Sequence, residues 1–419
     1  MTVTGYAISV LVAGPLNEAA LRSQVDAARR KLPGNRADLA LVFVSPPLLP
    51  SIRDILEIVQ VHGHVGHLVG CSAHGVIGQS EEVENGAAVS ILFLHLPGAE
   101  FTPLRIESEE IDEPIEPAAW HERTRVSPQQ TRGWLVFCDP RSLDAEQWLR
   151  QWNQVYPGVP TLGGLAGPAT DSEPAHLFID QKVYTDGAVG ISVGGTVSLE
   201  SVVSQGCTPI GNPWTITSAE RNFIRRIGNL PALTVLQNTF NALSAKEKAR
   251  ANGNIFVGLV VDEYREEHRR GDFLVRNLLG ADPAQGVVAV GARVRVGQTL
   301  QFQFRDATAA TEDLTALLEA TGQRLAGRRI AASILCSCAG RGHRLFGEHH
   351  HDTRLVHDLL GAGLPHAGFF ANGELGPVGV PGSRAPRRHP NFLHGYTASL
   401  ALFVVDDAPT PSSSPHVGT

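Results

Sequence analysis

Five short clusters combine chemically capable side chains with glycine, and each follows an apolar, strand-like segment. Strand ends that open into Gly-rich loops are where α/β proteins build pockets, because backbone N–H groups are exposed there. We therefore expect these clusters to contribute to one ligand site. They are Gly70–Gly75 (GCSAHG), Gly206–Gly211 (GCTPIG), Phe304–Ala307 (FRDA), Cys336–Gly342 (CSCAGRG) and Gly368–Pro377 (GFFANGELGP).

Arginine is the residue type in this set that best suits an anionic ligand. A guanidinium presents a planar fork that matches a carboxylate in two parallel hydrogen bonds. Arg276, Arg305 and Arg341 are therefore candidate anchors. The alternative is internal pairing, of Arg305 with the adjacent Asp306 or of Arg276 with Asp272, because a buried arginine must be paired.

An acidic residue lies in the last cluster, where glycines flank it. Backbone without side chains allows close approach to a carboxylate, so Glu374 could receive an amino group while Asn372 orients it. The alternative is a turn carboxylate that accepts local backbone N–H bonds. His394 is expected to orient a loop near this pocket.

Cysteine and histidine raise the possibility of catalysis. Cys71, Ser72 and His74 bring a thiol and an imidazole close in sequence, as a Cys–His pair requires, and Cys338 is a second candidate nucleophile. However, cysteine is among the residues most often simply buried. An enzyme is therefore the less favoured hypothesis, and Cys71 and Ser72 are expected to line the wall of a binding pocket.

Metal and cofactor binding is weakly indicated. The spacing of Cys336 and Cys338 is too tight for a zinc knuckle. Seventeen histidines, including His349–His351, leave non-covalent haem possible, because histidine is a common axial ligand. No Cys-x-x-Cys-His attachment motif occurs, and no Walker, Gly-x-Ser-x-Gly or HExxH motif is present. We therefore predict no cofactor, with haem as the alternative.

Composition excludes several classes of partner. The 419 residues include 35 Lys and Arg against 42 Asp and Glu, a formal charge of −7. Binders of nucleic acid or of anionic membranes need clustered positive charge, so neither partner is expected. No apolar run approaches the roughly 18 residues of a membrane span, and Met1–Val12 lacks a basic region before its apolar stretch. Five cysteines, an odd number, form no disulfide framework, and we expect a cytoplasmic protein.

In the first half of the chain, strand-like and helix-like segments alternate, and these elements must position the clusters. Tyr6–Ala13 is strand-like, and Leu16–Leu32 has apolar residues at helical spacing. Beyond about Thr217 the pattern becomes strand-rich. We therefore predict a layered α/β architecture for the first half and an α+β architecture for the second. We find no internal repeat of fixed period. The predicted divisions are an N-terminal domain of alternating strands and helices at 1–225, a strand-rich C-terminal domain at 226–405, and a disordered tail at 406–419.

Together the clusters resemble the FIST family, whose members pair a FIST-N with a FIST-C sensory domain. Several segments carry the resemblance, and their order and spacing make it specific over roughly residues 30–404. In the first half they are Gly70–Gly75, Thr161–Gly167 (TLGGLAG) and Gly187–Val193 (GAVGISV); in the second half they are Asp272–Gly280 (DFLVRNLLG), Arg305–Ala307 (RDA), Cys338–Gly342 (CAGRG), Gly368–Gly376 (GFFANGELG) and Asn391–Thr397 (NFLHGYT).

The resemblance implies a small-ligand sensor of signal transduction, because FIST domains are proposed to bind small molecules such as amino acids. One branch is reported to bind haem and sense nitric oxide, which is the alternative sensor hypothesis. This chain shows no output module, so output would pass through a separate signalling protein or through the oligomeric state. Combined with the residues above, the expected pocket lies between the two domains, with Arg341 and Arg305 on a carboxylate and Glu374 on an amino group.

Overall fold

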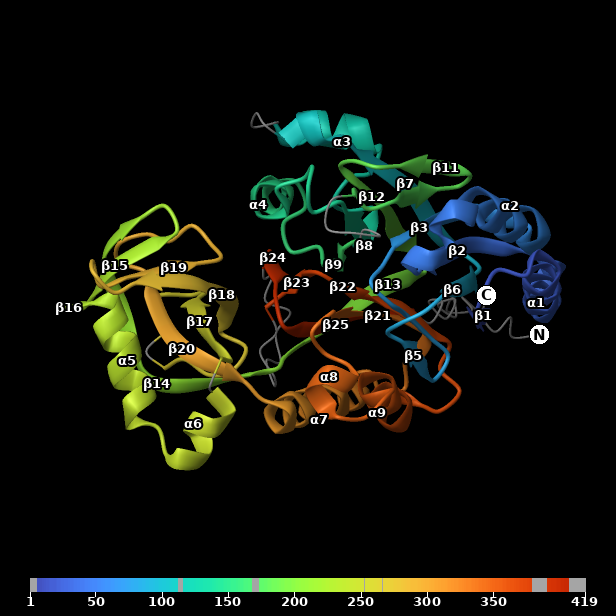
Figure 1. Cartoon of the computed structure of the whole chain (residues 1–419). Helices are drawn as coiled ribbons and strands as arrows, with labels where there is room; N and C mark the ends of the chain where they lie inside the picture. Colours follow the sequence, from blue (N-terminus) through green and yellow to red (C-terminus); the bar gives the residue numbers. More distant parts are fainter. Residues whose placement is uncertain are drawn as a thin grey trace, which may run out of the picture.

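The computed structural model describes residues 6–111, 116–167, 173–251, 253–265, 267–378 and 390–406, so the predicted tail lies outside the described residues from position 407 onward. The fold is mixed α/β with four sheets and a strand-rich C-terminal part, as predicted. Within the described ranges, every helix is too short or too polar to cross a membrane. Figure 1 shows a large main body with a smaller lobe beside it.

The main body consists of three units with the same order of elements, although the sequence shows no repeat. A strand and a helix lead to a second strand, a crossover helix, a parallel third strand, a hairpin and a fourth strand, which pairs between the first two. Unit 1 comprises β1 (Tyr6–Ala13), α1 (Glu18–Lys31), β2 (Ala37–Val44), α2 (Ile52–Gly63), β3 (Val65–Ser72), β4 (Val76–Gly78), β5 (Glu81–Val83) and β6 (Ala88–His95).

The other two units repeat this order. Unit 2 comprises β7 (Ala99–Ile106), α3 (Pro117–Thr124), β8 (Thr131–Cys138), α4 (Ala145–Val155), β9 (Thr161–Leu165), β10 (Leu177–Ile179), β11 (Lys182–Tyr184) and β12 (Ala188–Gly195). Unit 3 comprises β13 (Val197–Gln205), α7 (Ala307–Arg324), β21 (Arg329–Cys338), the short α8 (His343–Phe346), α9 (His351–Leu360), β22 (His366–Ala371), β23 (Glu374–Pro377), β24 (Asn391–His394) and β25 (Thr397–Val405).

The units exchange their hairpins in a cycle. The hairpin β4–β5 of unit 1 extends the sheet of unit 3, β10–β11 of unit 2 extends the sheet of unit 1, and β23–β24 of unit 3 extends the sheet of unit 2. Each hairpin therefore belongs in space to a neighbouring unit. The predicted division of the chain near residue 225 stays a prediction, and strands from both sides of it share two of these sheets.

A glycine recurs at one position of the third strand in every unit. At each of these glycines the second strand passes so close that an added Cβ would lie at most 2.0 Å from a backbone carbonyl oxygen. No side chain fits there, so the parallel strand pairs require glycine. The three contacts are Gly70 against Val42, Gly163 against Val136 and Gly368 against Leu335.

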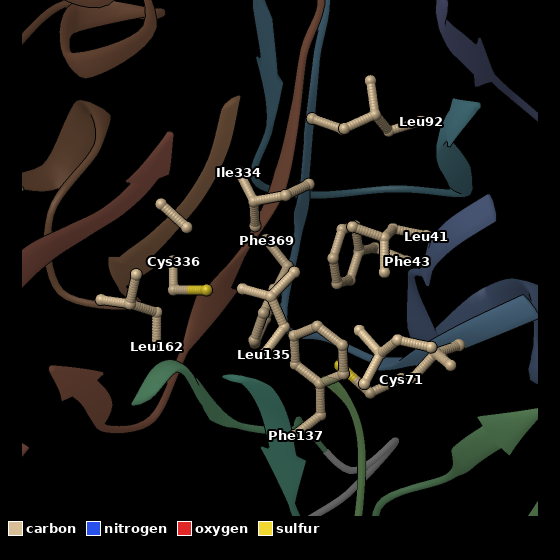
Figure 2. Close-up of a cluster of buried hydrophobic side chains, with 14 of the residues drawn as sticks. Leu41, Phe43, Cys71, Leu92, Leu135, Phe137, Leu162, Ile334, Cys336 and Phe369 are labelled. Atoms are coloured by element: carbon tan, nitrogen blue, oxygen red, sulfur yellow. The ribbon is translucent and has the colours of Figure 1, made fainter. Parts of the chain in front are cut away.

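The inner faces of the three sheets enclose one hydrophobic core. Phe43, Phe137 and Phe369, one from each unit, meet with ring centroids 5.0–5.6 Å apart (Figure 2). Cys71 and Cys336 lie in the same cluster. The outer face of each sheet packs against its own helices, because their apolar residues recur on one side, as Leu21, Val25 and Ala28 do in α1.

The lobe is residues 207–305, inserted into unit 3 between β13 and α7. Its sheet runs β14-β20-β17-β18-β19-β15-β16, and the additional pairing of β14 with β15 closes it around a separate core. Its elements are β14 (Cys207–Glu220), β15 (Phe223–Ile227), β16 (Leu230–Pro231), α5 (Ala232–Ala242), α6 (Ala245–Ala251), β17 (Ile255–Val260), β18 (Phe273–Asp282), β19 (Val287–Val290) and β20 (Thr299–Arg305).

Candidate functional site

The chain enters and leaves the lobe at one place, which we call the seam. It leaves β13 at Gly206 and returns at Asp306, whose N–H donates to the Gly206 carbonyl at 3.0 Å. Immediately beyond, Cys207 pairs with Arg305 in the sheet of the lobe. Two of the predicted clusters therefore meet at the seam, and two more reach it from unit 3.

Glu374 is the buried acid of the seam. Its Oε2 accepts hydrogen bonds from the Thr397 hydroxyl at 2.6 Å and from the Thr397 N–H at 3.1 Å, whereas its Oε1 has no hydrogen-bond partner among the described residues. Burial raises the pKa of Glu374 to about 8, against the effect of the Thr397 hydrogen bonds and of the Arg341 charge. A buried acceptor without a partner costs free energy, so the carboxyl group is suited to an external donor.

The other two units show that this carboxylate is not needed by the fold. In the hairpin strand that follows the third strand, Glu374 pairs with Gly164, as Leu177 pairs with Cys71 and Val76 with Phe369. Because each partner directly follows the close-contact glycine of its strand, the three positions are equivalent. Units 1 and 2 place a fully buried Val76 and Leu177 there. The partner of Glu374 differs in the same way: Thr397 corresponds to Ala88 and Gly187.

Arg341 is the buried base of the seam and is fully enclosed. Its Nε and Nη2 donate to the two carboxylate oxygens of Asp352 at 2.7 and 2.9 Å, so the fork expected for a ligand is used inside the protein. Although burial acts to raise it, the Arg341 guanidinium lowers the pKa of Asp352 below its usual range. The remaining nitrogen, Nη1, has no partner among the described residues. It lies beside Gly206, where an added Cβ would be 3.2 Å away.

Arg305 and Asp306 line an open cleft of about 570 Å³ at the mouth of the seam. Arg305 donates to the Gly340 carbonyl and lies over the Tyr396 ring, with its guanidinium carbon 5.6 Å from the centroid. Asp306 caps α7 by accepting from the Thr308 N–H at 3.1 Å. Its ion pair is with Arg250 of the lobe, not with the adjacent Arg305. Arg344 also lines the cleft, which is therefore predominantly cationic.

Tyr396 connects the seam with the lobe. Its ring packs against Phe256 of β17 with centroids 4.2 Å apart, and its hydroxyl donates to the Asn277 side chain. The backbone φ of Tyr396 is +65°, which is uncommon for a residue other than glycine. Such conformations persist where tertiary contacts impose them, and they cluster at functional sites.

Arg276 holds the lobe against the main body rather than facing a ligand. Its Nη2 donates to Glu146 Oε1 of α4 at 2.6 Å and to the Leu393 carbonyl of β24 at 3.0 Å. The internal partner is thus Glu146; Asp272, the partner expected as the alternative, instead pairs with Arg265. The residue is buried and its donors are occupied within the fold.

Four other predicted residues lie outside the seam or face away from it. Cys71 is in the central core, and the Ser72 hydroxyl donates to the Gly167 carbonyl at 2.6 Å and accepts from the His176 N–H at 2.8 Å. His74 follows this strand in unit 1. The Asn372 side chain is exposed, and its N–H donates to the Leu165 carbonyl at 3.3 Å. Ser72 and Asn372 thus fasten the strand ends of units 1 and 3 to unit 2.

His394 and Cys338 lie next to the seam. His394 is opposite Glu374 in the hairpin, and its Nε2 donates to the Gly376 carbonyl at 3.0 Å, while burial lowers its pKa to about 4. Burial raises the pKa of Cys338 to about 12 and raises that of Cys71 well above its ordinary range. Both thiols stay protonated near neutral pH, which is the less nucleophilic form, and this disfavours a cysteine-dependent enzyme.

Sequence reasoning missed the residues that support the seam. Thr397 and Tyr396 lie in a motif that carries the family resemblance, but nothing in their spacing indicates a contact with Glu374 or with the lobe. Asp352 lies in a helix with ordinary periodicity, and only tertiary packing brings it to Arg341. Within the described residues, no cluster of three or more His, Cys, Asp or Glu side chains is arranged to hold a metal ion.

Fold and site together define a protein with a polar seam between a main body and an inserted lobe. The model of the FIST N domain matches residues 38–229, and the model of the FIST C domain matches residues 232–377. The chain therefore belongs to the FIST family, whose domains are associated with signal transduction and small-ligand sensing.

Similar proteins occur in mycobacteria. The uncharacterized protein Rv0628c of Mycobacterium tuberculosis (strain ATCC 25618 / H37Rv) is 37% identical over 377 residues, which cover 90% of this chain and 94% of the relative. The uncharacterized protein Mb0898c of Mycobacterium bovis (strain ATCC BAA-935 / AF2122/97) is 36% identical over 379 residues, with the same shares covered. The likeness therefore extends over nearly the full length of both proteins.

Proposed function

We propose that the chain is a cytosolic sensor that binds a small ligand at the seam, an amino acid or another small carboxylate. The observation that carries this proposal is a buried base and a buried acid with one unpartnered atom each, Arg341 Nη1 and Glu374 Oε1. Buried polar atoms are almost always hydrogen-bonded, so two such atoms near one crossing point favour a ligand. The apolar residues at the positions equivalent to Glu374 support a role beyond folding.

The chemistry around these atoms favours a zwitterion. The cationic cleft with Arg305 and Arg344 suits a carboxylate, with Arg341 Nη1 as one further donor. Glu374 Oε1 suits an ammonium group once the carboxyl has lost its proton. Because the pKa of Glu374 is about 8, binding of an ammonium near pH 7 would release a proton.

The signal would be a change in the position of the lobe. The chain passes between the main body and the lobe at Gly206 and Asp306, and contacts that include those of Arg276 and Tyr396 hold the lobe in one arrangement. A ligand that binds one arrangement more tightly shifts the population toward it. A separate signalling protein would then read the lobe position.

The test is a thermal-shift screen of the full chain with amino acids, small carboxylates and small amines. A ligand at about 100 times its dissociation constant adds about 2.7 kcal/mol of stability. We expect Glu374→Gln to abolish the shift caused by an amino acid while preserving side-chain shape. Glu82→Gln is the matched control, because Glu82 is also buried and its pKa is also raised by burial, to about 7.

Two results would contradict the proposal. An amino acid that stabilises Glu374→Gln as much as the wild-type chain would remove Glu374 from the site. Equal loss of binding in Glu82→Gln would indicate a general effect of removing a buried carboxyl group, not a specific role of Glu374. Isothermal titration in two buffers of different ionisation enthalpy would then detect the expected proton release on binding.

A further inference from the structure

The exposed apolar side chains of this protein concentrate on the lobe. The lobe holds less than a quarter of the chain, yet it carries six of the seven large hydrophobic residues that are exposed in the described part. Clustered apolar exposure marks an interaction surface more often than single residues do. The six are Trp214, Phe223, Leu230, Tyr264, Leu279 and Val296; the seventh is Val61 of α2.

Two of these residues share one outer face of the closed sheet. Phe223 of β15 is directly opposite Ala289 of β19, and Gly280 of β18 is opposite the same alanine from the other side. Leu279 is the bulged residue next to Gly280. Phe223 is 44% exposed and Leu279 is 60% exposed. We call Phe223, Leu279 and Ala289 the outer patch; β15 lies toward the far side of the lobe from the main body (Figure 1).

The rim of the outer patch is mainly cationic, and its carboxylate Glu220, opposite Phe223 in β14, is ion-paired with Arg225. Arg221 precedes Phe223 by two residues, and its carbonyl accepts from the N–H of Val294, which stands between Arg293 and Arg295. These three arginines are exposed and form no ion pair within the described residues. The lobe contains 13 Lys and Arg against 8 Asp and Glu, although the whole chain has 35 against 42. The lobe is thus the cationic part of an acidic protein.

We propose that the outer patch docks an acidic segment of a partner protein, which inserts apolar side chains against Phe223 and Leu279. Unpaired arginines around an apolar centre complement carboxylates around apolar anchors, and arginine and aromatic residues dominate binding energy at such interfaces. The docking itself needs no ligand at the seam. Only its role as the output of the sensor rests on the proposed function.

Other occupants fit the patch less well. Single-stranded nucleic acid needs several aromatic side chains on which bases stack, and the patch contains only Phe223. A second copy that docked through the same face would bring its own Arg221, Arg293 and Arg295 against these arginines, and like charges repel. Charge and shape therefore favour an acidic protein segment.

The probe is a library of random peptides displayed on phage and selected on the full chain without added ligand. We expect the enriched peptides to combine Asp or Glu with Leu, Ile or Phe. Synthetic copies should bind at least about tenfold more weakly to Phe223→Ser/Leu279→Ser and to Arg293→Glu/Arg295→Glu. Their binding should also weaken with added salt, because the attraction is partly electrostatic.

The controls repeat the type of each change outside the lobe. Val61→Ser changes the exposed apolar residue outside the lobe, and Arg22→Glu/Arg30→Glu reverses two exposed charges on α1. Both should bind the peptides like the wild-type chain, with unchanged unfolding temperatures. Glu374→Gln should also bind them, which separates this test from a failure at the seam.

Four results would overturn the proposal. These are selection without enrichment, enriched peptides without acidic residues, peptides that bind both patch variants at full affinity, and binding of a single-stranded oligonucleotide in place of peptides. A dimer in solution that Phe223→Ser/Leu279→Ser dissociates would instead identify a second copy as the occupant.

Discussion

Units 1 and 2 form core where unit 3 forms a site. At the start of the exchanged hairpin, Val76 and Leu177 fill the interior, whereas Glu374 puts a carboxyl group there with one oxygen unpartnered. The strand pairing at this position is equivalent in all three units, and the side chain distinguishes unit 3. Burying an ionisable group without full pairing is unfavourable. Units 1 and 2 therefore provide an internal comparison for unit 3. A side chain of unit 3 that differs in chemistry from both equivalents is one that the fold does not require.

The connection after the first strand shows the same contrast. In unit 1 a short turn from Gly14 to Asn17 leads into α1, and Asn17 caps that helix. In unit 3 the lobe is inserted after the equivalent Gly206, and Asp306 caps α7. The two glycines make equivalent hydrogen bonds, because the Gly14 N–H donates to the Ala87 carbonyl as the Gly206 N–H donates to the Tyr396 carbonyl. The insertion thus leaves the order of elements in unit 3 intact and places the lobe beside the unpartnered atoms of Arg341 and Glu374.

The largest expected effect tests whether the units are equivalent. Gly70→Ala, Gly163→Ala and Gly368→Ala should each destabilise the fold by about 4 kcal/mol or more, because the added Cβ meets a backbone carbonyl. Urea unfolding would measure the loss. Gly363→Ala, where an added Cβ meets nothing within 4 Å, is the control. Clearly different losses of stability at the three glycines would show that the three units are not equivalent.

Removal of the seam base should be almost as severe. Arg341→Ala leaves the buried Asp352 carboxylate without its guanidinium partner, with Ser337 and His351 as its remaining side-chain contacts in the described structure, so we expect a loss of about 3–5 kcal/mol. In Arg341→Ala/Asp352→Ala the loss should be smaller than the sum of the two single losses, because neither charge is stranded. Additive losses in this double-mutant cycle would show that the pair is not coupled.

Conversion of the site into core should stabilise the protein. Glu374→Leu/Thr397→Val introduces apolar side chains like those of units 1 and 2, and buried polar pairs replaced in this way often yield about 1–4 kcal/mol. Chemical denaturation would measure the gain, and the thermal-shift screen should find no ligand. A less stable variant would mean that unit 3 needs its polar pair for folding.

Loss of the threonine alone should act in the opposite direction. Thr397→Val removes the hydroxyl that donates to Glu374 Oε2 at 2.6 Å, which should destabilise the chain by about 1–3 kcal/mol. Ser399→Ala removes a hydroxyl that donates to the Leu375 carbonyl and serves as the comparison. If both variants lose the same free energy of unfolding, the hydrogen bond to Glu374 contributes no more to stability than an ordinary buried hydrogen bond.

The smallest effect is a change in pH dependence. The pKa of Glu374 is raised from its ordinary value of 4.5 to about 8, so between these values the folded state holds a proton that the unfolded state has lost. Stability should therefore fall as pH rises through this window, by up to about 1.4 kcal/mol per pH unit. Glu374→Gln should lack this contribution to the pH dependence of stability. The contribution of Glu82 is present in both proteins and cancels in the comparison. Parallel profiles of stability against pH would contradict a buried, protonated Glu374.

Much of the fold follows from sequence patterns. Apolar periodicity predicts a strand at Tyr6–Ala13, which matches β1, and a helix over Leu16–Leu32, which contains α1. The threefold arrangement of units was missed, because equivalent positions share backbone geometry rather than residue type, as Val76, Leu177 and Glu374 illustrate. Equally, the partner of Arg276 lies 130 residues away at Glu146, a distance over which spacing carries no information.

The sequence by itself determined the local elements and the strand-end clusters, because each depends on residues that are close along the chain, and it determined the family through the order and spacing of short motifs. Tertiary structure alone decided which clusters meet. Cys71 and Ser72 became part of the core and its fastenings, while Arg341 and Glu374 came to the crossing of the lobe. The physical reason is the exchange of hairpins: β23 takes its register from Gly164, 210 positions before Glu374, and the carboxylate is buried between this strand and Thr397 of β25.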